Sequence, residues 1–137
     1  MRTTLRILLL ALLALGAALI LSCGPPPVTI NDTISSFVSS LNGNRSNTYT
    51  YTDPNAGNYN AAKTPSFWNT AFVPGSEPYT IPSGYDTSNP SSVIVTLNGN
   101  GSFYGTYKFV MVNDKNAGSD DWLINGIFTS PGGLQEF

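Results

Sequence analysis

Oxygen-bearing side chains gather in one short run whose spacing could suit a hard cation, Asp114-Lys115-Asn116-Ala117-Gly118-Ser119-Asp120-Asp121. Carboxylate, amide and hydroxyl oxygens at alternating positions are the ligands that Ca²⁺ prefers. Two positions argue against such a site. Ser119 stands where a calcium loop needs glycine, and Asn125 stands at the twelfth position, where a bidentate glutamate closes the coordination sphere. We therefore expect a solvated hairpin loop and no metal ion.

Side chains for acid–base or nucleophilic catalysis are scarce. The chain has no His and one Cys among its 137 residues, so it lacks the side chain most used for proton transfer near neutral pH. A serine nucleophile would need a neighbouring base, and neither a His nor a convincing Lys partner is present. No glycine-rich phosphate loop precedes a helix, and one Cys excludes a Cys-based zinc site. Asp and Tyr residues remain as acid–base candidates, and we predict a protein that is not an enzyme and holds no cofactor.

The single cysteine, Cys23, closely follows an apolar run at the N-terminus. Arg2 and Arg6 precede 15 residues without a polar side chain, from Ile7 to Leu21. A membrane-spanning helix needs about 20 such residues. A basic start followed by a short apolar run is typical of a secretory signal peptide. The alternative is a short N-terminal anchor helix.

The segment Ile20-Leu21-Ser22-Cys23-Gly24 resembles the lipobox of bacterial lipoproteins. The match is good at Ser22 and Cys23, whereas Leu21 is bulkier than the family usually shows. The resemblance implies that residues 1–22 are a signal peptide, that the chain is cut before Cys23, and that the Cys23 thiol carries a diacylglycerol. In many species the new amino group is acylated as well, for example with palmitate. Two or three acyl chains attach a protein stably to a membrane, whereas one does so only marginally.

The same resemblance implies a location in the bacterial cell envelope. Gly24 favours the outer membrane over the inner membrane in an organism that has both, because an Asp there favours retention in the inner membrane. Residues 23–28 then form a tether, in which Pro25-Pro26-Pro27 acts as a stiff, extended spacer.

The segment 29–137 is predicted to form one small domain of about 110 residues, enough for a modest core. Beyond the signal peptide the chain carries four basic and eight acidic side chains. No basic cluster is present, so we expect no nucleic-acid partner.

Apolar residues near the start of this domain recur with helical spacing. We predict an amphipathic helix over residues 29–41, capped by Asn31 or Asp32 and ended by Asn42-Gly43. Residues 44–52 are compatible with a short helix or an extended segment. The apolar stripe consists of Ile30, Ile34, Phe37, Val38 and Leu41.

The sequence of the last third of the chain predicts three antiparallel strands, 92–97, 102–112 and 122–129. Asn98-Gly99-Asn100-Gly101 is a strong hairpin turn signal. Gly105 and Gly126 lie inside strands, where glycine often marks a bulge or bend. Before the strands, residues 66–72 predict one or two helical turns and residues 79–81 predict a short strand. After residue 130 we expect a frayed tail.

A helix followed by a curved antiparallel sheet is α+β. The order of elements resembles the NTF2-like (cystatin-like α+β) superfamily, through the helix 29–41, the pair Phe67-Trp68 and the strands 102–112 and 122–128. The resemblance rests on element order without a sharp motif. Members of the superfamily include enzymes whose pockets, between helix and sheet, use His, Asp, Tyr or Arg. The alternative fold is a small all-β sandwich or barrel with one helix.

Aromatic residues on the concave face of the predicted sheet are the candidates for ligand binding, namely Phe103, Tyr107 and Trp122. The competing interpretation is that they fill the core. We expect a lipid-anchored envelope protein that binds a small apolar ligand or another envelope protein without catalysis. The alternatives are a structural envelope lipoprotein without a pocket, and an NTF2-like enzyme.

Overall fold

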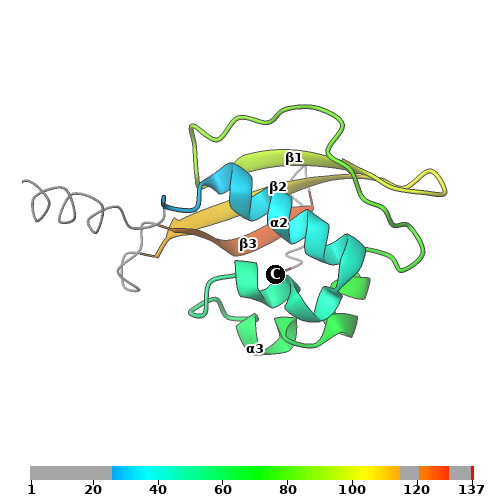
Figure 1. Cartoon of the computed structure of the whole chain (residues 1–137), viewed down its shortest axis with the longest axis horizontal. Helices are drawn as coiled ribbons and strands as arrows, with labels where there is room; N and C mark the ends of the chain where they lie inside the picture. The colour runs from blue at the N-terminus through cyan, green and yellow to red at the C-terminus, as the bar shows by residue number, and fades with distance from the viewer. Residues whose placement is uncertain (1–25, 115–120, 130–136) are drawn as a thin grey trace, which may run out of the picture.

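The computed structural model describes residues 26–114, 121–129 and 137, and in that part the chain is α+β. Helical segments lie against a three-stranded antiparallel sheet (Figure 1). The predicted α+β class with an antiparallel sheet is confirmed, and the all-β alternative is not what the chain adopts. Cys23 and the signal segment lie outside the described residues. No helix in the described ranges is long and apolar enough to cross a membrane.

Helix α2 spans Ile30–Gly43 and buries the apolar stripe that the sequence predicted. The N-cap is Thr29 rather than Asn31 or Asp32. Thr29 Oγ1 accepts a hydrogen bond from the Asp32 amide at 3.2 Å, and the Thr29 amide donates to the Asp32 carboxylate at 3.1 Å. This capping box satisfies two backbone donors of the first turn. The Thr29 hydrogen bonds also lower the pKa of Asp32.

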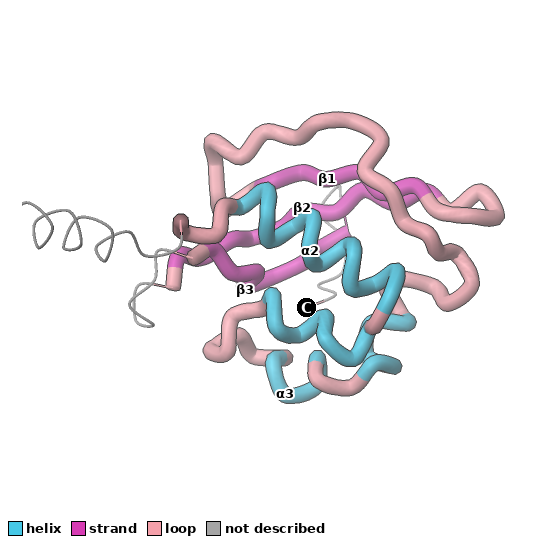
Figure 2. The backbone as a smooth tube through the Cα atoms, viewed as in Figure 1, coloured by secondary structure: helices cyan, strands magenta, loops and turns pink. Residues whose placement is uncertain are grey.

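Three short helical segments follow α2 and gather beside β3 (Figure 2). The region that the sequence left open forms the 3-10 helix η1, Arg45–Tyr51. Helix α3 spans Tyr59–Ala62, and the 3-10 helix η2 spans Pro65–Asn69 and confirms the predicted helical turn there.

The sheet is a meander in the order β1-β2-β3, as predicted. Strand β1 spans Val93–Asn98, β2 spans Tyr104–Asn113 and β3 spans Trp122–Thr129. The register of β2 against β3 shifts between Val110 and Met111, where Gly126 lies opposite Val110, so the bulge expected at Gly126 is confirmed. At Gly105 the register is regular, and the ring of Tyr107 covers the glycine instead: a Cβ there would lie 2.7 Å from the ring. The predicted strand at residues 79–81 is only a single bridge, between Thr80 and Asn98.

Aromatic rings fill the layer between α2 and the sheet. The fully buried Phe37 packs edge-on against Trp68, Phe72 and Phe109, with ring centroids 5.3, 5.8 and 5.8 Å away. Phe137 is also buried and stacks on Trp68 at 5.6 Å. The prediction of a frayed C-terminal tail is therefore wrong for Phe137, because its ring is part of the core; residues 130–136 lie outside the described ranges.

The long connection from η2 to β1 is fastened by Arg45 at the start of η1. Arg45 Nη1 donates to Asn69 Oδ1 at 2.7 Å and to the Phe72 carbonyl at 2.6 Å. Its Nη2 forms an ion pair with Glu77. The side chain of Arg45 is only 13% exposed, so one largely buried guanidinium links the end of η2 to two points of the connection.

Asn42 holds the same connection from the end of α2. Its side-chain amide donates to the Tyr79 carbonyl at 2.8 Å and accepts from the Tyr79 amide at 2.6 Å. The backbone amide of Asn100 donates to the Ser76 carbonyl at 2.8 Å, and this hydrogen bond links the connection to the β1–β2 turn. A residue that the sequence marked only as a helix stop therefore joins the helix to a distant loop.

The pKa of Glu77 is lowered in the folded protein, chiefly by a hydrogen bond from its own backbone amide, and further by the Gly75 amide and Arg45, against an opposing effect of burial. A carboxylate with a depressed folded pKa stabilises the fold above its unfolded pKa, and that contribution is lost as the pH falls through the folded value. We expect the free energy of unfolding to fall less steeply between about pH 5 and about pH 3 in Glu77→Gln than in the wild type. Urea denaturation across that range measures the slopes, and equal slopes would contradict this role of Glu77.

A polar groove between α2 and η1 is the candidate functional site

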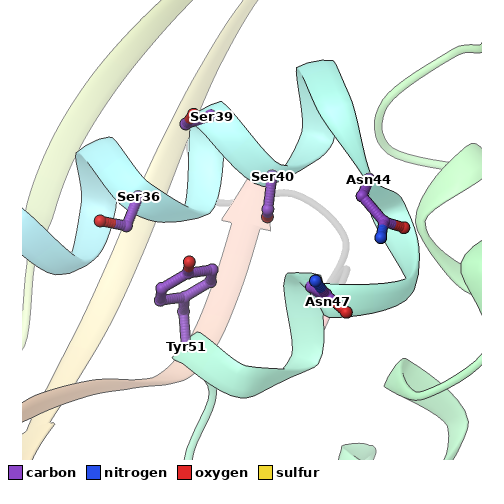
Figure 3. Close-up of a pocket in the computed structure, with 6 residues that line it drawn as sticks. All are labelled: Ser36, Ser39, Ser40, Asn44, Asn47 and Tyr51. Carbon is purple, nitrogen blue, oxygen red and sulfur yellow. The ribbon is translucent and has the colours of Figure 1, made fainter.

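A groove of about 230 Å³ lies where the second half of α2 faces η1 (Figure 3). Tyr51 points from the end of η1 toward α2, and Ser36 lies on the helix across from it. The groove is open to solvent and is smaller than the roughly 300–1,000 Å³ of a pocket for a drug-sized ligand. It therefore has room for one small molecule, or for one unit of a larger one. Its lining residues are Ser36, Ser39, Ser40, Asn44, Asn47 and Tyr51.

Helical spacing explains why α2 presents serines to the groove. Ser36, Ser39 and Ser40 are three and four residues apart, so they lie on one face of the helix. Ser40 Oγ donates to the Phe37 carbonyl at 2.7 Å and lies 2.9 Å from Thr48 Oγ1, which joins the floor of the groove to the buried Thr48 of η1. The helix and the 3-10 turn are thereby held at a fixed separation.

Asn44 positions the η1 side of the groove. Its Oδ1 accepts a hydrogen bond from the Ser46 amide at 3.1 Å and so caps η1. The Asn47 amide donates to the Asn44 carbonyl at 3.0 Å, which closes the first turn of η1. The local sequence thus fixes the backbone that carries Asn47 and Tyr51.

Four lining side chains keep their hydrogen-bonding capacity for a ligand. Within the described part of the chain, the hydroxyls of Ser36, Ser39 and Tyr51 and the amide of Asn47 form no side-chain hydrogen bond to protein. A hydroxyl both donates and accepts, and an amide offers two donors and an acceptor. The groove therefore presents donors and acceptors together, and none of its lining residues is charged.

The three aromatic residues predicted to bind a ligand are not brought together. Tyr107 is 4% exposed, and its hydroxyl donates to the Ala71 carbonyl at 2.8 Å. Phe103 packs on Tyr79 with centroids 5.1 Å apart. Trp122 pairs with Asn113, at the opposite end of β2 from Tyr107, roughly 20 Å away at about 3.3 Å per residue. None of the three lines the groove, and ligand binding by them stays a prediction.

The acidic run considered for calcium is described only at its two ends. The Asp114 amide donates to the Asp121 carbonyl at 2.8 Å, as expected of the base of a hairpin. Asn125, at the position of the missing glutamate, donates to Asp53 Oδ2 at 2.8 Å. Among the residues that the structure describes, no three His, Cys, Asp or Glu side chains gather in a way that could hold a metal ion.

Comparison with protein-family models, with curated proteins and with solved structures finds no match for this chain. The chemistry of the groove therefore follows from its residues alone.

The groove was not predicted from the sequence, although one signal pointed to it. Helix α2 carries four serines on its polar side and, apart from Asp32, no charged residue. The solvent face of an ordinary surface helix carries charged residues, and serine is a weaker helix former than Lys, Glu or Gln. A helix with a solvent face rich in serine and poor in charged residues is less stable than one with the usual charged face. Such a face is therefore a signal that these serines have another role, for example in binding a ligand.

Proposed function

We propose that this protein is a lipid-anchored module of the bacterial cell envelope that binds a small polar target without catalysing a reaction. The observation that carries the proposal is the uncharged polar groove between α2 and η1, beside an interior occupied by aromatic rings. An apolar ligand between helix and sheet would have to displace Phe37, Phe72 and Phe109. We therefore place the ligand at the surface.

Binding without catalysis is supported by the side chains at the groove. Its hydroxyls belong to Ser36, Ser39, Ser40 and Tyr51. Each would need a neighbouring base to act as a nucleophile, and the lining contains no Lys, carboxylate or His. Hydrogen bonding to a bound molecule is the chemistry that remains.

The anchor is supported by the leader sequence. Cys23 follows a signal-like segment, and the first turn of α2 begins seven residues later, at Ile30. A lipid on Cys23 would hold the domain close to the membrane surface, with the prolines at 25–27 as spacer. In an organism with two membranes, Gly24 supports the outer membrane over the inner membrane as the destination.

As a finer description of the fold, we propose an NTF2-like relationship. It is supported by the order of elements, with α2 first and an antiparallel meander last. The register shift between Val110 and Met111 is a device that bends a sheet around a helix.

The anchor is tested by Cys23→Ser in the full-length protein expressed in its bacterial host. We expect the wild type in the membrane fraction with a lipid mass on the residue at position 23, and Cys23→Ser unprocessed and without that mass. Ser22→Ala is the matched control, because it keeps a small residue before the thiol and should still be lipidated. A wild-type protein with a free thiol and an intact leader would contradict the proposed function.

A further inference from the structure

We propose that the α2–η1 groove binds a neutral, hydroxyl-rich ligand, namely one sugar ring, either free or as a unit of a polysaccharide. The inference rests on the proposed function and names its ligand class. The lining contains no Asp, Glu, Lys or Arg side chain, so a charged ligand would find no partner of opposite sign in the groove.

The polarity of the lining excludes apolar ligands by the same reasoning. An apolar molecule would cover the hydroxyls of Ser36 and Tyr51 and the amide of Asn47 and leave them without water or a partner. Complete burial of one such unpaired group costs about 1–3 kcal/mol, and partial covering in this open groove costs a fraction of that. A ligand that returns a hydrogen bond to each of these groups avoids that cost.

A sugar ring meets this requirement because every hydroxyl both donates and accepts, as the groove side chains do. The free groups lie on both sides of the groove, with Ser36 on α2 and Asn47 and Tyr51 on η1 (Figure 3), and the exposed Ser39 of α2 also contributes to the lining. A flat polyol placed between the walls can bond to both.

Tyr51 adds an aromatic ring to the hydrogen-bonding groups of the groove. The phenol ring is half-buried and packs against the core, so its position is fixed before a ligand arrives. A sugar has an apolar C–H face as well as hydroxyl edges, and a rigid aromatic ring beside a few polar groups suits both.

The experiment is a calorimetric titration of the full-length protein, purified in a polyoxyethylene detergent so that no sugar headgroup competes. The probes are glucose, the anion gluconate, the cation glucosamine, and dextran as a neutral polymer. We expect binding of glucose or dextran, with gluconate and glucosamine at least about tenfold weaker, the equivalent of about 1.4 kcal/mol. Binding of glucose identifies a free sugar as sufficient, and binding of dextran alone identifies a polymer as the ligand.

Two variants at exposed positions locate the binding. Ser39→Tyr places a ring at the mouth of the groove, and Asn47→Ala removes one amide. Each should weaken saccharide binding by about tenfold. Ser66→Tyr, at an exposed position on η2, is the matched control and should bind as the wild type does.

The inference is overturned if neither glucose nor dextran binds, if the charged sugars bind as tightly as glucose, or if Ser39→Tyr and Asn47→Ala leave the affinity unchanged. These outcomes are separable from failure of the proposed function. A lipidated Cys23 without saccharide binding overturns only the ligand class, whereas saccharide binding by an unlipidated protein overturns only the anchor.

Discussion

Phe37→Ala is expected to lower the free energy of unfolding by about 3–5 kcal/mol, the usual cost of removing a buried aromatic ring. Phe37 has no exposed surface. Its ring contacts Trp68 from η2, Phe72 from the connection that follows η2, and Phe109 from β2 of the sheet. The cavity would therefore open where the two layers meet, and neighbours held in three different segments of the chain cannot all move in to fill it. Small domains have only about 5–15 kcal/mol of stability in total.

Urea denaturation followed by tryptophan fluorescence measures this effect, since Trp68 lies beside Phe37. Phe37→Leu keeps most of the apolar volume and should lose less than the alanine variant. Val73→Ala, at a side chain 49% exposed, is the control and should change stability by no more than about 0.5 kcal/mol. A loss below about 1 kcal/mol for Phe37→Ala would show that the ring is not at the centre of the core.

Arg45→Ala is expected to cost about 2–3 kcal/mol. Removal of one partner from a fully buried ion pair costs about 3–5 kcal/mol, and the value is reduced here because the Glu77 side chain is 26% exposed. The substitution also removes the hydrogen bonds to Asn69 Oδ1, which is exposed, and to the Phe72 carbonyl, which is part-buried. Arg45→Lys keeps the charge but replaces a planar fork by one ammonium group, so it should recover only part of the loss.

The control for Arg45→Ala is Lys63→Ala, which removes a positive charge at an exposed position whose ammonium group lies 3.2 Å from Asn60 Oδ1 and over the Tyr59 ring. It should change stability by no more than about 0.5 kcal/mol. If the two alanine variants lose the same small amount, the Arg45 contacts do not hold the connection between η2 and β1.

Periodic patterns made the regular elements predictable. The stripe from Ile30 to Leu41 and the alternation along β2 are local signals, and they predicted the faces that are buried. The signal at Gly126 also predicted the bulge. The helix cap was misassigned because Thr29 and Asp32 form a reciprocal pair, and either residue type is a good N-cap when seen alone.

Features that depend on tertiary contacts could not be predicted. Asn42 pairs with Tyr79, and Arg45 with Glu77, across 37 and 32 residues of chain. Phe137 joins the core by stacking on Trp68, 69 residues (137 − 68) earlier in the chain. The aromatic residues proposed as a ligand site were assigned from their type and their place on the concave face of the predicted sheet, and neither distinguishes a pocket wall from a core. The groove forms because η1 packs beside α2, and no local sequence pattern predicts that packing.

Saccharide binding in the α2–η1 groove is tested most directly by an amide chemical-shift map of the protein titrated with a neutral sugar. We expect shifts confined to residues 36–51, with the largest at Ser36, Asn47 and Tyr51 on the two walls of the groove. Shifts centred instead on Phe103, Tyr107 and Trp122, or no shifts at saturating sugar, would contradict it.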